Sequence, residues 1–270
     1  MNMDSIKQYL TDKNFDITRY DSLGTQGLPE SREEREKWLH ENSHQLAKLQ
    51  ELFCADKRFG LLVILQGMDT SGKDGTVRHV FHDANPLGLK VHSFKSPTEE
   101  ELSHDYLWRI HQAVPRRGEI AIFNRSHYED VLITHVRGWI DDKELQLRLR
   151  QINDFERMLT ENNILIIKMF LHISKDEQRY RLQKRLDNTH KHWKFNLSDL
   201  TDRKLWDKFQ EQYQTVIRAT AQTNAPWYIV PADSKSSRNI IVMKILTAHL
   251  QQLNLQYPRV DDSNWPKTVD

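Results

Sequence analysis

The chain has a single cysteine, Cys54, and no apolar run long enough to cross a membrane. One cysteine excludes an intramolecular disulfide, and Cys54 falls in an expected helix, where packing explains it better than nucleophilic chemistry. The N-terminus lacks the basic, apolar and small-residue order of a signal peptide. The formal net charge is +1 over 270 residues, so there is no overall field for nucleic acid or a membrane surface. These absences predict a soluble cytoplasmic protein without a nucleic-acid or membrane partner.

Short segments rich in Val, Ile or Phe alternate with helical segments from Leu61 onwards. Strands are expected from Leu61 into a glycine loop, and then at roughly 89–94, 119–124, 164–171 and 227–230. Capping-box patterns predict helix starts at Ser31 with Glu34, Thr98 with Glu101, and Ser174 with Glu177. Such alternation favours an α/β fold, with a parallel five-stranded sheet and helices on both faces.

The composition gives no sign of a second domain, an internal repeat or a low-complexity tract. Residues 1–30 are mixed and polar and predict an N-terminal arm. Residues 31–257 are long enough for one α/β domain with a substantial core. Within it, about 180–205 is expected to form a helical lid, and 258–270 a C-terminal tail.

The most informative segment runs from Leu61 through the glycine loop that carries Lys73. Gly67 and Gly72 permit a tight turn, which directs backbone N–H groups inward, and the helix that begins near Gly72 adds its positive end. Lys73 would reach the outer phosphates of a bound chain. The Gly-x4-Gly-Lys spacing alone is weak, but the strand, loop and helix context favours a phosphate loop over a structural turn.

Carboxylates in this loop indicate a divalent cation. Asp74 stands where the ordinary loop has Ser or Thr after the lysine, and Asp69 lies inside the loop. Two carboxylates would repel a phosphate ligand unless a cation lay between them, which implies magnesium. The alternative for Asp74 is a favourable interaction with the helix dipole.

A second charged group follows the strand expected at 119–124. Because strand ends meet at one edge of a parallel sheet, Arg125, Glu129 and Asp130 should lie near the bound phosphates. Arg125 suits charge that develops in a transition state, and Glu129 suits a metal or an acceptor nucleotide. An exposed arginine in a solvated turn is the alternative.

Residues 175–208 hold many basic side chains. Arg181 and Arg185 stand four residues apart and share one helix face, while Lys191 and Lys194 fall in the irregular segment that follows. A basic flap over a phosphate loop would exclude water from phosphoryl transfer. The alternative is a solvated helix face balanced by neighbouring Asp and Glu residues. The histidines lack partners at zinc-type spacing, so zinc is not expected.

The ordered set of these motifs resembles the polyphosphate kinase 2 family over about residues 30–255. The motifs are Gly67-x-Asp69-x-x-Gly72-Lys73-Asp74-Gly75, Ser93-Phe94-Lys95-x-Pro97-Thr98, Trp108-Arg109-Ile110-His111, Asn124-Arg125-Ser126-His127-Tyr128-Glu129, Lys191-x-Trp193-Lys194 and Ala225-Pro226-Trp227-Tyr228. The resemblance implies a thymidylate-kinase-like phosphate-loop kinase fold. It also implies transfer of the terminal phosphate of inorganic polyphosphate to a nucleotide, with magnesium, in a homo-oligomer such as a dimer or tetramer.

Site residues carried over from the resemblance fall into three groups. The catalytic residues would be Asp69, Lys73, Arg125 and Glu129, of which Asp69 and Glu129 would hold the metal. The loop would bind phosphate through Gly67, Thr70, Ser71, Gly72, Lys73, Asp74 and Gly75. Arg125 would clamp the phosphates, and Arg181, Arg185, Lys191 and Lys194 would form the lid and bind the polyphosphate.

Two positions depart from the family pattern. Asn124 replaces an aspartate that many members carry, and the Asn-Arg-Ser-His-Tyr-Glu version resembles the subgroup acting on AMP as well as ADP. Asn188-Thr189 replaces a common Asp-Pro in the lid. Guanine nucleotides stay open as further acceptors. An ATP-dependent nucleoside monophosphate kinase and a catalytically silent nucleotide- or polyanion-binding protein are the alternatives.

Overall fold

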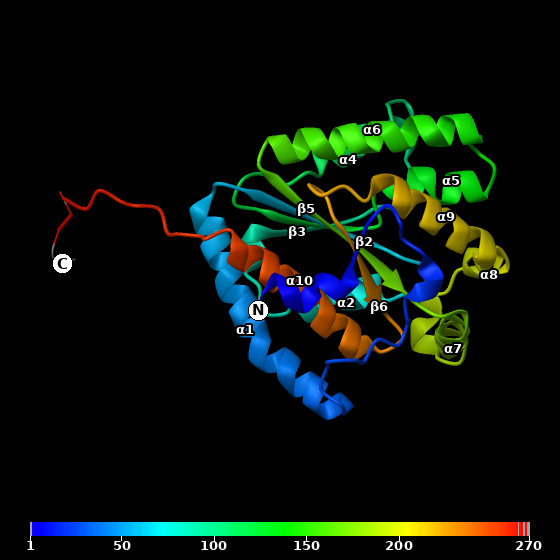
Figure 1. Ribbon diagram of the computed structural model, residues 1–270, viewed down its shortest axis with the longest axis horizontal. Helices are drawn as coiled ribbons and strands as arrows, with labels where there is room; N and C mark the ends of the chain where they lie inside the picture. Colours follow the sequence, from blue (N-terminus) through cyan, green and yellow to red (C-terminus); the bar gives the residue numbers. More distant parts are fainter. Residues whose placement is uncertain (1, 264, 267, 269–270) are drawn as a thin grey trace.

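The computed structural model describes residues 2–263, 265–266 and 268. One sheet forms the centre of the molecule, with strand order β1-β6-β5-β2-β4-β3 (Figure 1). The strands are β1 (Leu10–Thr11), β2 (Gly60–Gln66), β3 (Leu89–Ser93), β4 (Ile120–Asn124), β5 (Ile164–His172) and β6 (Trp227–Pro231). All neighbours pair in parallel except β1, which is antiparallel to β6. The predicted parallel sheet is therefore confirmed, but it has a sixth strand.

The additional strand comes from the segment that was expected to be an arm. Residues 1–30 also contain the 3₁₀ helices η1 (Met3–Tyr9) and η2 (Ile17–Arg19). Ile6, Tyr9 and Phe15 are buried in the main hydrophobic core, and η1 contacts both β6 and the last helix. This segment therefore packs against the sheet. A two-residue strand has no periodic pattern that could have been recognised in the sequence.

Helices cover both faces of the sheet, as predicted. They are α1 (Arg32–Asp56), α2 (Lys73–Val80), α3 (Glu99–Leu102), α4 (Trp108–Gln112), α5 (Ile133–Val136), α6 (Asp142–Glu161), α7 (Lys175–Leu186), α8 (Leu197–Lys204), α9 (Trp206–Thr220) and α10 (Lys235–Gln252). Short 3₁₀ helices follow at η3 (Pro86–Gly88), η4 (His127–Val131) and η5 (Thr189–Lys194). In Figure 1, α6 and α9 lie on one face, and α1, α2 and α10 on the other. The side chains of the four inner strands β2, β4, β5 and β6 are almost entirely buried, whereas those of the edge strand β3 are partly exposed.

Local capping explains where the main helices begin. At α1, Ser31 Oγ accepts from the Glu34 amide and Glu34 Oε2 accepts from the Ser31 amide, each at 3.0 Å, which completes the predicted capping box. At α7, Ser174 Oγ accepts from the Glu177 amide at 3.1 Å. The Ser174 amide instead donates to Asp233 Oδ1 at 2.8 Å, so only half of that predicted box forms.

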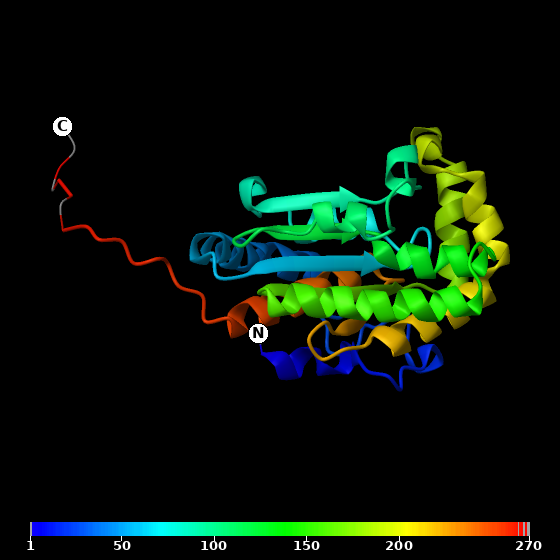
Figure 2. The same ribbon diagram turned by 90° about the horizontal axis from the view of Figure 1, so that it is seen from above.

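The predicted lid corresponds to the end of α7, η5 and α8. Figure 2 shows these elements beyond the arrowheads of the strands, at the carboxyl edge of the sheet. Ligands bind at this edge in open α/β sheets. The fold therefore brings the glycine loop after β2, the polar segment after β4 and the basic lid to the same end of the molecule.

Candidate active site

The glycine loop joins β2 to α2 with three residues in left-handed or related backbone conformations. Gly67, Thr70 and Gly72 have φ angles of 150°, 66° and 101°. Gly72 forms the N-cap of α2, and the Ser71 amide donates to Met68 O at 3.0 Å within the loop. The hydroxyl oxygens Thr70 Oγ1 and Ser71 Oγ are buried and have no hydrogen-bond partner among the described residues. Orphaned polar atoms of this kind fit a loop that binds a polar ligand.

Lys73 begins α2, and its side chain turns back over the loop. Its Nζ donates to Gly67 O at 2.6 Å and to Met68 O at 3.3 Å. Burial, and secondarily the charge of Arg125, lowers the pKa of Lys73 to about 8. The ammonium group is therefore buried beside the loop in a setting that disfavours its charge, and a phosphate would relieve that cost.

Arg125 follows β4 in a left-handed conformation, with φ of 64°. Its amide donates to Leu65 O at 3.1 Å, which fixes the backbone beside the end of β2. Its Nη2 donates to Asp69 Oδ1 at 2.6 Å. Glu129, against the effect of burial and with help from Asp69, raises the pKa of Arg125. The structure therefore brings Asp69 and Arg125 together, as expected from the topology.

Glu129 lies in η4 and is half-buried close to the same charges. Burial raises the pKa of Glu129, while Arg125 and Lys73 oppose this effect. Magnesium in kinases is commonly held by one or two carboxylates together with substrate phosphates and water. Asp69 and Glu129 fit that donor set, although the described residues contain no cluster of three or more ligands for a metal.

Asp74 connects the loop to β4 and to the lid. Asn124 Nδ2 donates to Asp74 Oδ1 at 2.6 Å, and Lys194 Nζ lies 3.9 Å from Asp74 Oδ2. The Lys194 ammonium also lies over the ring of Trp193, 4.8 Å from its centroid. Asp74 therefore accepts from the neutral Asn124 amide and lies within ion-pair distance of Lys194, which goes beyond an interaction with the helix dipole.

The lid is held by its own charges. Arg185 Nη1 donates to Lys194 O at 3.1 Å and to Asp199 Oδ2 at 3.3 Å. Burial, and secondarily Asp69, raises the pKa of Asp199 to about 6. Lys191 is exposed. Asp199 was not singled out from the sequence, where the acidic residues of this segment are interpreted only as balancing charges.

Arg181 differs from the other predicted lid residues. It is buried, and its guanidinium donates to the carbonyl oxygens of Thr70, Ser71, Ala232 and Asp233 and to Glu177 Oε1. These acceptors occupy its donors, so in this structure Arg181 holds the underside of the phosphate loop. Its binding of polyphosphate from the lid stays a prediction. Helical spacing placed it on the same face as Arg185 but could not show its depth.

Arg238 was not singled out from the sequence. It lies in the first turn of α10, is 2% exposed, and its Nη1 donates to Ser71 O at 3.2 Å. Gln178 Nε2 also donates to the loop, to Asp69 O at 3.2 Å. An isolated arginine at a helix start gives no sequence signal for such a contact.

A buried polar network supports the segment that carries Arg125 and Glu129. Lys168 Nζ donates to Glu156 Oε2 at 2.5 Å, to the Tyr128 hydroxyl at 2.9 Å and to Thr220 O at 2.8 Å. Tyr128 in turn donates to Glu156 Oε1 at 2.8 Å. Because Tyr128 lies within the segment, the network anchors it to β5 and α6.

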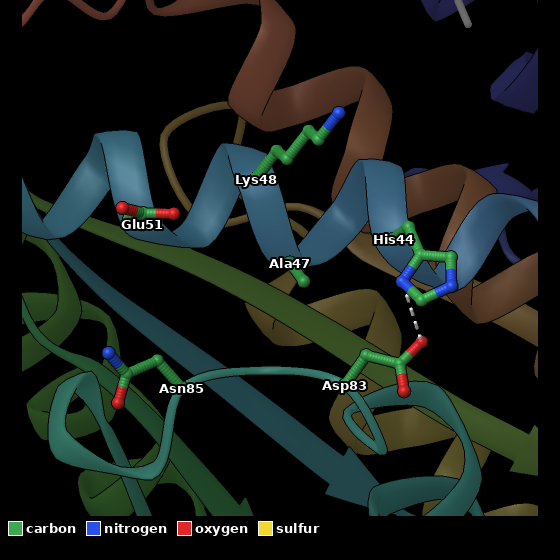
Figure 3. A pocket seen from close by; sticks show the side chains of 6 residues that line it. All are labelled: His44, Ala47, Lys48, Glu51, Asp83 and Asn85. Atoms are coloured by element: carbon green, nitrogen blue, oxygen red, sulfur yellow. Dashed lines mark ion pairs between the residues drawn. The ribbon is translucent and has the colours of Figure 1, made fainter.

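A separate hollow of about 400 Å³ lies between α1 and the connection after α2 (Figure 3). It is lined by His44, Ala47, Lys48, Glu51, Asp83 and Asn85. His44 faces Asp83, with 3.5 Å between Nδ1 and Oδ2. None of the predicted site residues lines it.

Within the described residues, no helix is both long and apolar enough to span a membrane.

A phosphate loop that enters a helix at the carboxyl edge of a parallel sheet, beside a basic helical lid, defines a phosphate-loop kinase. The model of the polyphosphate kinase 2 family matches residues 29–258, and the chain belongs to this family. It is 49% identical over 253 residues to an AMP/ADP-polyphosphate phosphotransferase of Meiothermus ruber. The aligned residues make up 94% of this chain and 95% of the relative.

Further relatives agree with this assignment. An ADP-polyphosphate phosphotransferase of Rhodopseudomonas palustris is 40% identical over 241 residues, 85% of this chain and 83% of its own length. The crystal structure of polyphosphate kinase 2 from Arthrobacter aurescens TC1 superposes with a TM-score of 0.91 at 42% identity. The match covers 94% of this chain and 92% of that structure. The resemblance inferred from the motifs is confirmed.

Proposed function

We propose that this protein transfers the terminal phosphate of inorganic polyphosphate to AMP and ADP, reversibly and with magnesium. Family membership and the names of the relatives support the reaction class. The observation that carries the proposal is the convergence of Lys73, Arg125, Asp69 and Glu129 at one edge of the sheet. Phosphoryl transfer depends mainly on alignment and neutralisation of charge, which this set can provide.

The donor chain would lie in the loop. Its terminal units would contact the backbone amides and hydroxyls of the segment Gly67, Thr70, Ser71, Gly72, Asp74 and Gly75. Lys73 Nζ would leave the carbonyl oxygens of Gly67 and Met68 and donate to the phosphates, because an anion is a stronger acceptor than a carbonyl. Arg125 would donate to the transferring group. Magnesium, held by Asp69 and Glu129, would neutralise phosphate charge.

The acceptor requires little activation by the protein. The attacking phosphate oxygen of AMP or ADP is already an anion, so no strong general base is needed. Arg185, Lys191 and Lys194 would cover the reacting groups from the lid and exclude water. Arg181 would act through the loop that it supports.

Several finer features belong to the same proposal. We count guanine nucleotides among the further candidate acceptors. A cytoplasmic location and a homo-oligomer, a dimer or tetramer, are expected from the resemblance to the family. The single cysteine agrees with a reducing compartment.

The decisive experiment supplies pure protein with magnesium and polyphosphate, together with AMP or ADP and without ATP, and follows nucleotide products by chromatography. We expect ADP and ATP to form. Formation of products only when ATP is the donor would establish the monophosphate kinase alternative. Binding of polyphosphate without turnover would establish the silent binding protein.

Lys73→Ala tests the site itself. We expect a loss of several kcal/mol of transition-state stabilisation, about the scale of removing a preorganised charge. Lys143→Ala, on the exposed first turn of α6, is the matched control and should keep the original turnover. An undiminished turnover number for Lys73→Ala rejects the assignment.

A further inference from the structure

Five cationic side chains are buried in the described part of the chain: Lys73, Arg109, Lys168, Arg181 and Arg238. Three of them have a carboxylate partner within ion-pair distance. Arg109 pairs with Glu101 and Asp130, Lys168 with Glu156, and Arg181 with Glu177. A buried charge is costly unless it is paired, so these partners are expected.

Among the described residues, no carboxylate pairs with either Lys73 or Arg238. Both side chains lie against the phosphate loop. Lys73 is already assigned to the phosphates, whereas no step of the proposed reaction uses Arg238. Two buried cations at one loop, neither with a carboxylate within ion-pair distance, indicate that an anionic ligand supplies the balancing charge.

The hydrogen-bond partners of Arg238 are neutral. Its Nε and Nη2 donate to Asn239 Oδ1 at 3.2 Å and 2.9 Å, and its Nη1 donates to Ser71 O. Burial, and secondarily the charge of Arg181, lowers the pKa of Arg238. The guanidinium is therefore held in place by hydrogen bonds that leave its charge uncompensated.

Two glycines of the loop make room for this guanidinium. A Cβ atom on Gly72 would collide with Arg238 Nη1, and one on Gly75 would lie 3.3 Å from Nη2. Gly75 has no positive φ and lies inside α2, where glycine lowers helix stability. Close approach of Arg238 gives a physical reason for glycine at this position.

The contact also orients one peptide group of the loop. Ser71 O accepts from Arg238 Nη1 at 3.2 Å and from Arg181 Nη1 at 3.3 Å, both from beneath the loop. In a planar trans peptide the N–H points opposite to the carbonyl, so the Gly72 N–H is directed away from the two arginines. In the proposed binding mode, that direction would lead towards the phosphate oxygens.

We propose that Arg238 is a positioning residue for the phosphate chain. From beneath the loop it fixes the Ser71–Gly72 peptide with its N–H toward the ligand, and its charge is balanced by the bound phosphates. The inference rests on the proposed function for the identity of the anion. It adds that Arg238, which does not touch the ligand, contributes its positive charge to phosphate binding.

Arg238→Met and Arg238→Lys test the charge. The probe is inorganic triphosphate with magnesium, and its binding is measured by calorimetry without nucleotide. We expect Arg238→Met to weaken binding about tenfold or more, which is the scale of one unit charge in a partly screened site. Arg238→Lys should recover part of this loss. Lys244→Met, on the same helix but over the ring of Trp38, is the control and should bind as the original protein does.

Asn239→Asp separates the electrostatic role from a structural one, and it still tests the proposal if Arg238→Met does not fold. The substitution keeps the shape of the side chain and gives Arg238 a carboxylate. We expect triphosphate binding to weaken about tenfold while the unfolding temperature stays equal or rises, because the buried cation is then paired. A structural defect would lower both quantities. Unchanged triphosphate affinity in folded Asn239→Asp overturns the proposal.

The same measurements separate this inference from the proposed function. If the unsubstituted protein binds triphosphate but transfers no phosphate from polyphosphate, the proposed function is rejected. The triphosphate affinities of the variants still decide the role of Arg238. If the unsubstituted protein transfers phosphate, and its Asn239→Asp and Arg238→Met variants bind triphosphate as well as it does, the proposed function is retained and the inference is rejected.

Discussion

Arg125 donates to Asp69 at 2.6 Å, so a side chain proposed for the phosphates and one proposed for magnesium neutralise one another. While the pair is formed, Asp69 is less available to magnesium and Arg125 is less available to phosphate. Cation and phosphate would separate the pair together, since the cation takes the carboxylate and the phosphate takes the guanidinium. Binding of magnesium and polyphosphate should therefore be cooperative.

Arg125→Met should move two measurements in opposite directions. Removing the guanidinium frees Asp69, so magnesium should bind more tightly in the absence of phosphate. The value of kcat should fall about a hundredfold or more because transition-state charge loses a donor. Magnesium titration by calorimetry and steady-state kinetics check the two effects. Arg116→Met, an exposed arginine paired with Glu119, is the control, and a parallel loss of both quantities would contradict the pairing.

The pKa of Lys73, lowered to about 8, predicts opposite pH trends for activity and stability. The value of kcat/KM should fall above about pH 8, because the free protein loses the ammonium that holds phosphate. Stability should rise between about 8 and the ordinary value of 10.5, because the unfolded state then binds more protons than the folded state.

Lys73→Arg is the informative variant for this trend, since arginine stays charged throughout that range. The alkaline fall of kcat/KM near pH 8 should disappear in it, whatever its absolute rate. Persistence of the fall would assign the titration to another group. Urea unfolding at several pH values checks the stability trend.

Asn124→Asp should make stability depend on magnesium. The Asn124 amide donates to Asp74 Oδ1 at 2.6 Å, so the substitution places two carboxylates in contact. We expect a destabilisation of about 1–3 kcal/mol at neutral pH, recovered when magnesium is added. Acid should also recover it, since like charges raise the pKa of one carboxyl and its protonation removes the repulsion. Asn162→Asp, exposed at the end of α6, should show no magnesium effect in the same thermal scans.

Lys168→Met should be strongly destabilising, by about 3–5 kcal/mol, because Glu156 would stay buried without its cation. Adding Glu156→Gln should restore part of the stability by removing that charge. Chemical denaturation of the single and double variants measures the effect. A double variant less stable than Lys168→Met would show that Glu156 is satisfied by other groups.

The parts of the fold with strong local patterns could be predicted from the sequence. The alternating strands, the Ser31 capping box and the loop before Lys73 each combine neighbouring residues whose spacing has a direct geometric meaning. The proximity of Asp69 and Arg125, which are far apart in the chain, could be predicted because the carboxyl ends of parallel strands meet at one edge of the sheet. This rule needs only the element order.

The remaining features depend on depth and on contacts across the chain. Arg181 and Arg185 share a helix face in the sequence pattern, but tertiary packing buries the first beneath the loop and leaves the second in the lid. Arg238 reaches the loop only because α10 packs beside α2. The short strand β1 depends on β6, which is distant in sequence, so its mixed composition predicted an arm.

The pairing of β1 with β6 has a practical consequence for attaching the protein to surfaces or fusion partners. Residues 2–30 cover the outer strand of the sheet, so trimming them or anchoring through them would strip core side chains and leave β6 open to pairing with other chains. Figures 1 and 2 show the chain after α10 leaving the body of the molecule, away from the carboxyl edge of the strands. Immobilised preparations for nucleotide regeneration should therefore carry their linker at the carboxyl terminus.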